Sequence, residues 1–543
     1  MDIKFLGASK VVTGSNFLIT TEKYKILIDC GLFQGKEELE RLNYEEFQFI
    51  PSEIDFLMLS HAHIDHSGRI PKLVKEGFKG KIICTKATKD LADIMLVDSG
   101  HIQESDAEWL NKKRNRAGKP PIQPLYTSED ARLSLNYFDP VLYNQKVQLN
   151  EGISVRFKDA GHILGSSILE LWITDKADTV KIVYSGDLGI KGKPIIRDPE
   201  TIEEADYLIL ESTYGNRLHE DLNGRTSKLT NIINSTVSRG GTVIIPSFAV
   251  GRTQELIYEL KKYYENTDNL DAFLKVPIYI DSPMAISATE IFKRNSNCFD
   301  DEAKKIIFDG VDPLNFENLH FVRSHQESMR LNEVDFPKVI ITTNGMCTAG
   351  RIRHHLKHNL WKSKNSVVFV GYQAEGTLGR ILKDGVKNVK LLGEEIAVLA
   401  EIHSVEGFSG HADQSNLIDW VKEFKKRPKK IFIVHGEVDA SQALSERISS
   451  QLGIDTIIPD VGHTFKIEDD VLKAYSGELV EPLQRKENIK QELQEVFNQF
   501  ENIVSKTNLF IDDKLLEKNY DELKNKLLEL QRELIDITLL LGK

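Results

Sequence analysis

The stretch LSHAHIDHSGR (residues 59–69) places three histidines and one aspartate within six consecutive positions. The whole chain has only 15 histidines among 543 residues, so this density indicates a dedicated site. The residues before it, IDFLMLS, have the pattern of a buried strand, and strand alternation puts His61 and His63 on one side, where both can bind one ion. Asp65 and His66 follow as the chain curls away, and they point to a second position nearby. Imidazole nitrogen and carboxylate oxygen together are the ligand set of Zn²⁺ or a similar cation, so the motif predicts a metal site.

The same arrangement, a polar side chain directly after a short apolar strand, recurs along the chain. Four residues cannot complete the ligand shells of two metals, so the missing ligands must come from such positions. Each position is weak evidence alone, because an acidic residue there often caps a turn. Their recurrence favours one shared site. The ligand candidates are His162, Asp187, His411 and His435, and two further acids that follow strands are Asp29 and Glu211.

Composition indicates a soluble globular protein of two to four domains. The residues are 41% hydrophobic and 28% charged, and the chain is too long for a single core. No apolar run is long enough to span a membrane, and the first residues lack the layout of a signal peptide. The four cysteines lie far apart without a CxxC pair, which is typical of reduced thiols. We therefore expect a cytoplasmic location and no membrane partner.

The charge of the chain is unevenly distributed. A formal net charge of −12 argues weakly against a nucleic-acid partner, because phosphate binding favours basic surfaces. Two segments, NKKRNRAGK (111–119) and RIRHHLKHNLWKSK (351–364), nevertheless each carry five Lys or Arg residues and no acid. Each segment is either a solvated surface or a contact for an anionic partner.

Strand and helix patterns divide the chain into regions. In the first two hundred residues, short apolar runs end in polar clusters, as in a sheet with a site along one edge. From about 225 to 395, strands alternate regularly with helices, which indicates a second α/β unit with a parallel sheet. After this region, strand–loop–helix units carrying isolated histidines return.

The last stretch, from about 480 to 543, has a different pattern. Leu and Ile recur at three- and four-residue steps among charged residues, which predicts two amphipathic helices joined by a short loop. This helical hairpin either packs on its own chain or forms a homodimer.

The ordered motifs resemble those of a known family. Asp29, HxHxDH, His162 and Asp187, in this order, resemble the motifs of the metallo-β-lactamase fold. Glu211, His411 and His435 resemble the extra motifs of its β-CASP branch of nucleases. Segments such as GASKVVTGS, ESTYGNR, PSFAVGRTQE, NGMCTAGR and GFSGHADQ match bacterial and archaeal relatives of the endonuclease subunit of the cleavage and polyadenylation specificity factor. The resemblance spans about residues 1–475.

The resemblance implies the fold class, an α/β protein. An αββα metallo-β-lactamase sandwich would carry an inserted α/β β-CASP domain, followed by the C-terminal helical hairpin. The insertion accounts for the changed pattern near 225 and for the return of site histidines near 411. The expected boundaries are 1–213 and 396–475 for the two parts of the metallo-β-lactamase domain, 214–395 for the β-CASP domain and 476–543 for the extension.

The resemblance also implies an activity. It points to a ribonuclease that hydrolyses RNA phosphodiester bonds, as an endonuclease, a 5′-exonuclease or both, through a hydroxide activated by two Zn²⁺ ions. Mn²⁺ or iron are alternative metals, and single-stranded RNA is the expected partner. A bridging carboxylate would hold the two cations about 3.5–4 Å apart, the spacing used in two-metal phosphate chemistry. One metal would take His61, His63 and His162, the other Asp65, His66 and His435, with Asp187 as the bridge.

Further residues receive roles through the same resemblance. His411 would protonate the leaving ribose oxygen or stabilise its charge, with Glu211 orienting its ring. Asp29 would orient a ligand histidine. The inserted domain of the family covers the cleft, so basic side chains in it become candidates for phosphate contacts. The substrate-binding candidates are Arg252, Arg351, Arg353 and Ser166, although a turn role for Ser166 is an equal alternative.

Three other functions remain as alternatives. A DNA-processing β-CASP nuclease is the nearest, but such members generally lack a histidine at the last motif, so His435 favours RNA. A catalytically inactive scaffold partner would have lost metal ligands, and every expected ligand is present. A small-molecule hydrolase could use the HxHxDH motif, but its substrate would need no inserted cover.

Overall fold

The structure is a computed structural model that divides into two compact units, Met1–Ala474 and Tyr475–Lys543. It describes residues 1–175, 178–219, 224–266, 276–374, 376–405, 407–408, 410–468, 471–473, 520–522 and 524–530. In the second unit, residues 520–522 and 524–530 are helical. The remainder of the predicted C-terminal hairpin, and the dimer contact expected there, lie outside the described residues. Among the described helices, none combines the length and the apolar character needed to cross a membrane.

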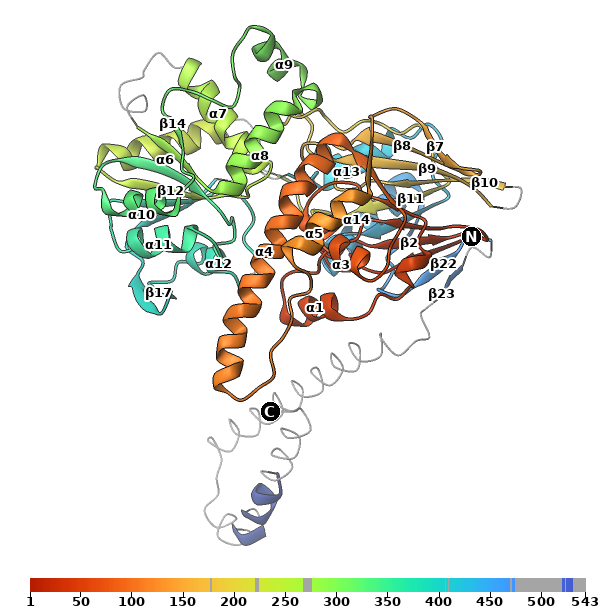
Figure 1. The fold of residues 1–543 in the computed structure, drawn as a ribbon, viewed down its shortest axis with the longest axis horizontal. Helices are drawn as coiled ribbons and strands as arrows, with labels where there is room; N and C mark the ends of the chain where they lie inside the picture. Colours follow the sequence, from red (N-terminus) through yellow and green to blue (C-terminus); the bar gives the residue numbers. More distant parts are fainter. Residues whose placement is uncertain are drawn as a thin grey trace. The chain divides into compact units, whose positions relative to one another are not determined.

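Two large sheets, built from the beginning and the end of the unit Met1–Ala474, lie next to the inserted region (Figure 1). The eight-stranded sheet runs in the order β23 (Val471–Lys473), β22 (Thr464–Lys466), β1 (Asp2–Phe5), β2 (Phe17–Thr20), β3 (Lys25–Ile28), β4 (Phe56–Met58), β5 (Lys81–Thr85) and β6 (Phe138–Val141). The seven-stranded sheet runs in the order β21 (Asp455–Ile457), β20 (Lys430–Val434), β11 (Tyr207–Glu211), β10 (Asp178–Tyr184), β9 (Ser167–Asp175), β8 (Ile153–Asp159) and β7 (Val147–Asn150).

A continuous apolar core joins the inner faces of these two sheets. Alternate residues of each strand contribute to it, among them Phe5 and Phe17 from one sheet and Phe157 and Phe432 from the other. Alternation sends the intervening residues to the outer faces, where they pack against helices. The outer helices are α3 (Ile70–Lys75), α4 (Lys86–Arg116) and α5 (Ser128–Ser134) on the first sheet, and α13 (Gln414–Lys422) and α14 (Val438–Leu452) on the second.

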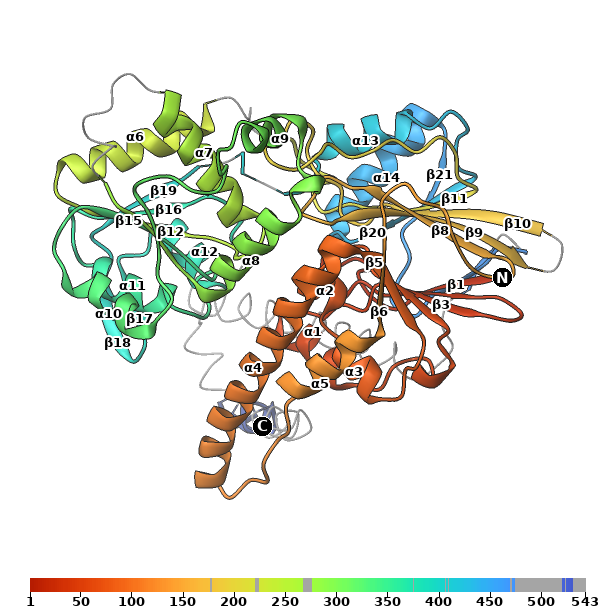
Figure 2. The same cartoon turned by 45° about the horizontal axis from the view of Figure 1, so that its top comes forward.

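This four-layer arrangement confirms the predicted αββα sandwich (Figure 2). The sandwich is assembled from distant parts of the chain, because β20 pairs with β11 and β21 pairs with β20, although more than two hundred residues separate both from β11. Short helices α1 (Glu37–Arg41) and α2 (Ile64–Ser67) lie in its loops.

The inserted region contains a six-stranded parallel sheet, as the strand–helix alternation predicts. Successive side chains of each strand point to opposite faces of the sheet, and both faces are buried. In β12, Val243 and Ile245 pack toward helices on one side and Ile244 packs toward helices on the other. Its strands are β14 (Leu319–Phe321), β13 (Ile278–Asp281), β15 (Lys338–Thr342), β12 (Thr242–Pro246), β16 (Ser366–Phe369) and β19 (Glu401–Ser404), in spatial order. A two-stranded ribbon, β17 (Asn388–Leu391) and β18 (Glu394–Ala397), accompanies it. Its helices are α6 (Arg225–Ser238), α7 (Arg252–Asn266), α8 (Pro283–Arg294), α9 (Asp301–Phe308), α10 (His325–Glu333), α11 (Ile352–Asn359) and α12 (Leu378–Lys383).

Strand β19 extends the inserted sheet beyond the predicted boundary at residue 395. Its residues pair with β16 from Ser366↔Glu401 to Phe369↔Ser404. The chain therefore leaves this sheet after Ser404, and returns to the sandwich with α13.

Candidate metal centre

One edge of the sandwich gathers the polar residues that follow the strands. β3 and β4 are parallel neighbours, and β10, β11 and β20 form a second parallel set. The carboxyl ends of parallel strands meet at the same edge, which is where sites form in such sheets. The loop between β8 and β9 adds His162 to this edge.

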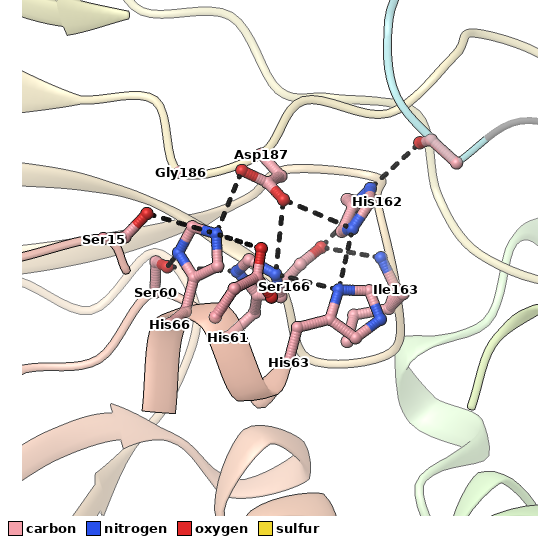
Figure 3. Close-up of polar contacts among 12 residues, drawn as sticks. Ser15, Ser60, His61, His63, His66, His162, Ile163, Ser166, Gly186 and Asp187 are labelled. Carbon is pink, nitrogen blue, oxygen red and sulfur yellow. Dashed lines mark hydrogen bonds and ion pairs between the residues drawn. The ribbon is translucent and has the colours of Figure 1, made fainter. Parts of the chain in front are cut away.

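The first donor cluster contains three histidines and one carboxylate, all within reach of a single ion (Figure 3). His63 Nδ1 lies 3.1 Å from His61 Nε2 and 3.1 Å from His162 Nε2. Asp187 Oδ2 lies 3.5 Å from His61 Nε2 and 3.6 Å from His162 Nε2. The four donor atoms thus surround one point.

The second donor cluster lies on the other side of Asp187. His66 Nε2 and His435 Nε2 are 3.2 Å apart, and Asp65 Oδ2 lies 3.7 Å and 3.4 Å from them, respectively. Asp187 Oδ1 lies 3.3 Å from His66 Nε2. Asp187 therefore turns one carboxylate oxygen toward each cluster.

The spacing of the donors fits divalent cations. In a tetrahedral zinc site with Zn–N distances of about 2.0–2.1 Å, neighbouring donor atoms lie about 3.3 Å apart, and the donor separations in both clusters range around this value. Asp187 Oδ1 is buried and has no hydrogen-bond donor among the described residues. A buried carboxylate oxygen without a donor is costly unless a cation satisfies it. The donor set and this oxygen together fit a metal centre.

The pKa shifts of the site histidines also fit a metal centre. Burial lowers the pKa of His61 and of His162 well below the ordinary value, which favours the neutral imidazole that binds a metal. For His66, burial also lowers the pKa, but the carboxylates around it, chiefly Asp187, outweigh burial and raise the pKa well above its ordinary value. A pocket negative enough to hold a proton on His66 is negative enough to hold a cation instead.

The ligand imidazoles are held by contacts on their second ring nitrogens. Asp29 Oδ2 lies 2.7 Å from His66 Nδ1, and Asp29 accepts hydrogen bonds from Ser60 N and Ser60 Oγ. His162 Nδ1 lies 3.0 Å from the carbonyl oxygen of Gly410, and His435 Nδ1 lies 3.0 Å from Thr213 Oγ1. Such contacts fix the tautomer and orientation of a ligand ring. Asp29 thus lies behind His66, in the position predicted for an orienting residue.

The backbone is in the left-handed region at two of these residues. Asp29 has φ 53° and His435 has φ 51°, a region that non-glycine residues visit infrequently. The turn at His435 is fixed by its amide, which donates to the carbonyl oxygen of Ala8. Each turn redirects the chain at the end of a strand and aims the side chain along the edge.

Glu211 and His411 form a pair beside the first donor cluster. His411 Nδ1 lies 3.3 Å from Glu211 Oε1 and 3.8 Å from Asp187 Oδ2. Glu211 is fully buried and accepts hydrogen bonds from the amides of Leu188 and Thr213, whereas the His411 side chain is 21% exposed. The pair thus combines a fixed buried carboxylate with an imidazole that reaches the surface of the site.

Two predicted substrate contacts lie close to the metal loop; the Ser166 hydroxyl and Arg252 Nη1 already have partners, whereas the buried Arg252 Nε has none among the described residues. Ser166 is buried, and its hydroxyl accepts hydrogen bonds from the amides of His162 and Ile163. This geometry corresponds to the turn role of Ser166. Arg252 Nη1 pairs with Glu255 at 3.3 Å, and only a tenth of the arginine side chain is exposed.

The other two predicted contacts, Arg351 and Arg353, begin α11 in the inserted region. The guanidinium of Arg351 is bound to Asp281 Oδ1 at 2.6 Å and to the carbonyl oxygens of Val322 and Arg323. Arg351 is therefore engaged within its own domain. Arg353 is half-buried, and no side-chain partner for it occurs within the described residues.

Sequence reasoning missed the buried lysine that joins the two domains at the site. Lys193 Nζ donates to the carbonyl oxygen of His162 at 3.1 Å and lies 3.7 Å from Glu255 Oε2 in α7. Glu255 also pairs with Arg225 at 3.2 Å and with Arg252. One carboxylate thus links three cations from both sides of the domain junction. No strand-end pattern marks Lys193, so the sequence offers no signal for it.

Comparison with known protein families gives consistent matches along the chain. Residues 10–222 match the metallo-β-lactamase superfamily, residues 253–382 match the Beta-Casp domain, and residues 395–459 match the Zn-dependent metallo-hydrolase RNA specificity domain. Ribonuclease TTHA0252 of Thermus thermophilus is 36% identical over 449 residues, which cover 83% of this chain and 96% of that protein. The chain belongs to the β-CASP family of metallo-β-lactamase-fold hydrolases.

Archaeal members of the β-CASP family are also similar to this chain. Transcription termination factor FttA of Methanocaldococcus jannaschii is 30% identical over 469 residues, covering 84% of this chain and 70% of that protein. The factor of the same name from Methanosarcina mazei is 32% identical over 466 residues, covering 83% and 69%. The family recognised from the motifs is thus confirmed, and membership makes the protein a metallo-hydrolase with a metal cofactor.

Proposed function

We propose that this β-CASP protein is a ribonuclease that hydrolyses RNA phosphodiester bonds with two divalent cations, zinc being the preferred metal. The observation that carries the proposal is the pair of donor clusters joined by Asp187, with Glu211 and His411 beside them. Four carboxylates belong to the site, and two divalent cations would balance their charge. The four are Asp29, Asp65, Asp187 and Glu211.

The ligands divide between two cations. His61, His63 and His162 would hold one, Asp65, His66 and His435 the other, with Asp187 shared. When bound, divalent cations supply Lewis-acid chemistry, lowering the pKa of water and stabilising charge on phosphate oxygens. Asp29 keeps His66 Nε2 directed at its cation through the contact at Nδ1.

His411 is proposed to act on the leaving ribose oxygen. Glu211 accepts at His411 Nδ1, which directs proton donation to Nε2. The partial exposure of the ring lets this nitrogen reach a substrate, while the buried Glu211 keeps the ring in place. His411 therefore serves as the general acid and Glu211 as its positioning residue.

Three observations favour RNA as the substrate. One relative is named a ribonuclease, and the others are named transcription termination factors. The matched domain at residues 395–459 is described as an RNA specificity domain. The last motif retains His435, and its ring completes the second donor cluster. The complete donor set disfavours an inactive scaffold.

The domain limits and substrate contacts follow from the same proposal. We place the end of the inserted β-CASP domain after β19, at Ser404, because that strand belongs to its sheet. Arg353 is the predicted arginine best placed to contact a phosphate, since Arg252 and Arg351 are bound to carboxylates.

The deciding experiment incubates the purified protein with circular RNA and with 5′-labelled linear RNA, with and without a chelator. Chelator-sensitive hydrolysis is expected, and cleavage of the circle would identify endonuclease action. Asp187→Asn is expected to abolish hydrolysis, whereas Asp439→Asn, an exposed carboxylate of α14, is the matched control. Absence of hydrolysis of either RNA, with metals shown to be bound, would overturn the proposal.

A further inference from the structure

Helix α4 extends far beyond the sheet that it covers (Figures 1 and 2). Its 31 residues, at about 1.5 Å each, make it about 46 Å long. Its buried residues are concentrated between Ala87 and Gly100, with only Ala107 beyond them. The second half of α4 and the segment that returns to α5, residues 101–127, therefore form a projection that we call the arm.

The arm is built to keep its shape with little apolar burial. The Asn111 side chain donates to the carbonyl oxygen of Ile122 and accepts from its amide. Arg114 Nε donates to the carbonyl oxygen of Pro120, and the Lys119 amide donates to the carbonyl oxygen of Arg114. These polar contacts tie the returning segment to the helix without adding to a hydrophobic core.

The tip of the arm is strongly basic in an acidic chain. Residues 111–119 carry five Lys or Arg residues and no acid, while the chain as a whole has a net charge of −12. Within the described part of the chain, none of the five lies at ion-pair distance from a carboxylate. The nearest acids along the helix, Asp106 and Glu108, lie one to two turns closer to the sandwich. The five are Lys112, Lys113, Arg114, Arg116 and Lys119.

Stabilisation of the helix end accounts for only part of this pattern. Basic residues in the last turn favour the carbonyl end of a helix, which explains Lys113, Arg114 and Arg116. It does not explain Lys112 or Lys119, which lie outside that turn. Nor does it explain the exposed Trp109, 56% accessible, whose ring is covered by Lys113 Nζ at 3.5 Å.

We propose that the arm is a second RNA-binding surface, which holds the RNA backbone at a distance from the metal centre. Unpaired lysines and arginines beside an exposed aromatic ring are the combination that binds single-stranded nucleic acid, through phosphate contacts and base stacking. This inference rests on the proposed ribonuclease function, because RNA is the polyanion that the protein must recruit despite its negative net charge.

Helix α4, which carries the arm, starts at the metal loop. Thr85 Oγ1 and Thr88 Oγ1 both donate to the carbonyl oxygen of Gly165, at 2.8 Å and 2.7 Å, in the loop that carries His162. From there, α4 leads to the basic tip. With a phosphate spacing of about 3.4 Å along a stacked strand, its length corresponds to about 14 nucleotides. A stacked strand shorter than this, bound at the metal centre, does not reach the tip.

The test compares two variants that each lose four positive charges. The arm variant is Lys112→Gln, Lys113→Gln, Arg116→Gln and Lys119→Gln, and it keeps Arg114 because of its structural contact. The control variant removes four exposed lysines that lie apart from one another, Lys23→Gln, Lys36→Gln, Lys79→Gln and Lys390→Gln. Binding of labelled RNAs of about 40 and about 8 nucleotides, longer and shorter than the reach of the arm, is measured with chelator over a range of salt concentrations.

For the long RNA, the arm variant is expected to bind more weakly than the control variant. Its slope of log Kd against log salt concentration should fall by about 2–3, since each phosphate contact contributes about 0.7 on a single strand. Binding and metal-dependent hydrolysis of the short RNA should match the control. Equal long-RNA affinities and equal slopes for the two variants would overturn the proposal. Long-RNA binding through the arm without any hydrolysis would instead overturn the ribonuclease function alone.

Discussion

Replacement of Asp29 by asparagine is expected to lower metal affinity at the second donor cluster and to leave metal affinity at the first donor cluster unchanged. Asp29 contacts only His66 among the ligand histidines, at 2.7 Å from Nδ1. Asparagine keeps the shape of the side chain, can still accept from the Ser60 amide, and tolerates the left-handed φ of 53° at this position. With its oxygen toward the Ser60 amide, asparagine turns its NH2 group toward His66 Nδ1, so the substitution removes both the negative charge and the hydrogen-bond acceptor behind His66.

The size of the effect follows from the position of Asp29 behind a ligand. Loss of such a partner typically lowers metal affinity about 10- to 100-fold, which equals about 1.4–2.7 kcal/mol. Asp29 and His66 are both fully buried, so solvent does not screen the contact, and the upper half of this range is expected. The cation held by His61, His63 and His162 has no contact with Asp29 and should bind as before.

A chelator titration of the metal-loaded protein measures this difference. Metal content per chain is determined at each chelator concentration. For Asp29→Asn, one of the two cations is expected to leave at a 10- to 100-fold lower free chelator concentration than in the unsubstituted protein, while the other keeps its midpoint.

The matched control is Asp281→Asn in the inserted domain. Asp281 also holds a buried histidine, His355, at 2.5 Å, but no donor cluster lies there in the described structure. This variant should keep both metal midpoints. Unchanged midpoints for Asp29→Asn, or an equal loss of both cations, would refute the assignment of Asp29 and His66 to one of two separate metal positions.

Three further substitutions test other parts of the structure. His411→Ala is expected to retain both cations but to lower kcat about 10²- to 10⁴-fold, and near-normal turnover would contradict its role as general acid. Glu255→Gln leaves Lys193, Arg225 and Arg252 as buried cations without their shared carboxylate. The free energy of unfolding, measured by thermal unfolding followed by circular dichroism, should fall by about 3–5 kcal/mol. An unchanged unfolding temperature would argue against a stabilising role of Glu255 at the domain junction. Burial raises the pKa of Asp159 to about 7, so the folded state holds its proton more tightly than the unfolded state, and stability should fall by up to about 4 kcal/mol as the pH rises from about 4 to 7. Asp159→Asn should remove this fall, and a pH dependence equal to that of the unsubstituted protein would show that another group causes it.

Much of the fold and of the site could be predicted from local sequence patterns. The strands before His61 and His435 are short apolar runs; β4 ends at Met58, three residues before His61, and β20 ends at Val434, directly before His435. Parallel pairing brings such strand ends to one edge, so a list of strand-end residues already resembles the list of donors. The regular strand–helix alternation of residues 225–395 similarly indicates a parallel sheet.

Other features depend on contacts between distant residues, which no local pattern shows. The basic appearance of Arg351 suggested a phosphate contact, but the residue is bound to Asp281, seventy positions earlier. His355 is fully buried in the same network, where its Nε2 lies 2.5 Å from Asp281 Oδ2. Strand β19 looks like a continuation of the final domain, and only its pairing with β16 assigns it to the inserted sheet.

The late position of β20 in the chain has a consequence for biosynthesis. This strand pairs with β11 across more than two hundred residues and delivers His435 to the second donor cluster. A ribosome must therefore translate every residue up to His435 before this cluster can form. A nascent chain shorter than this remains tethered to its own messenger RNA while it lacks both a core strand and a metal ligand. The topology thus delays formation of the full donor set until β20 and His435 have been synthesised.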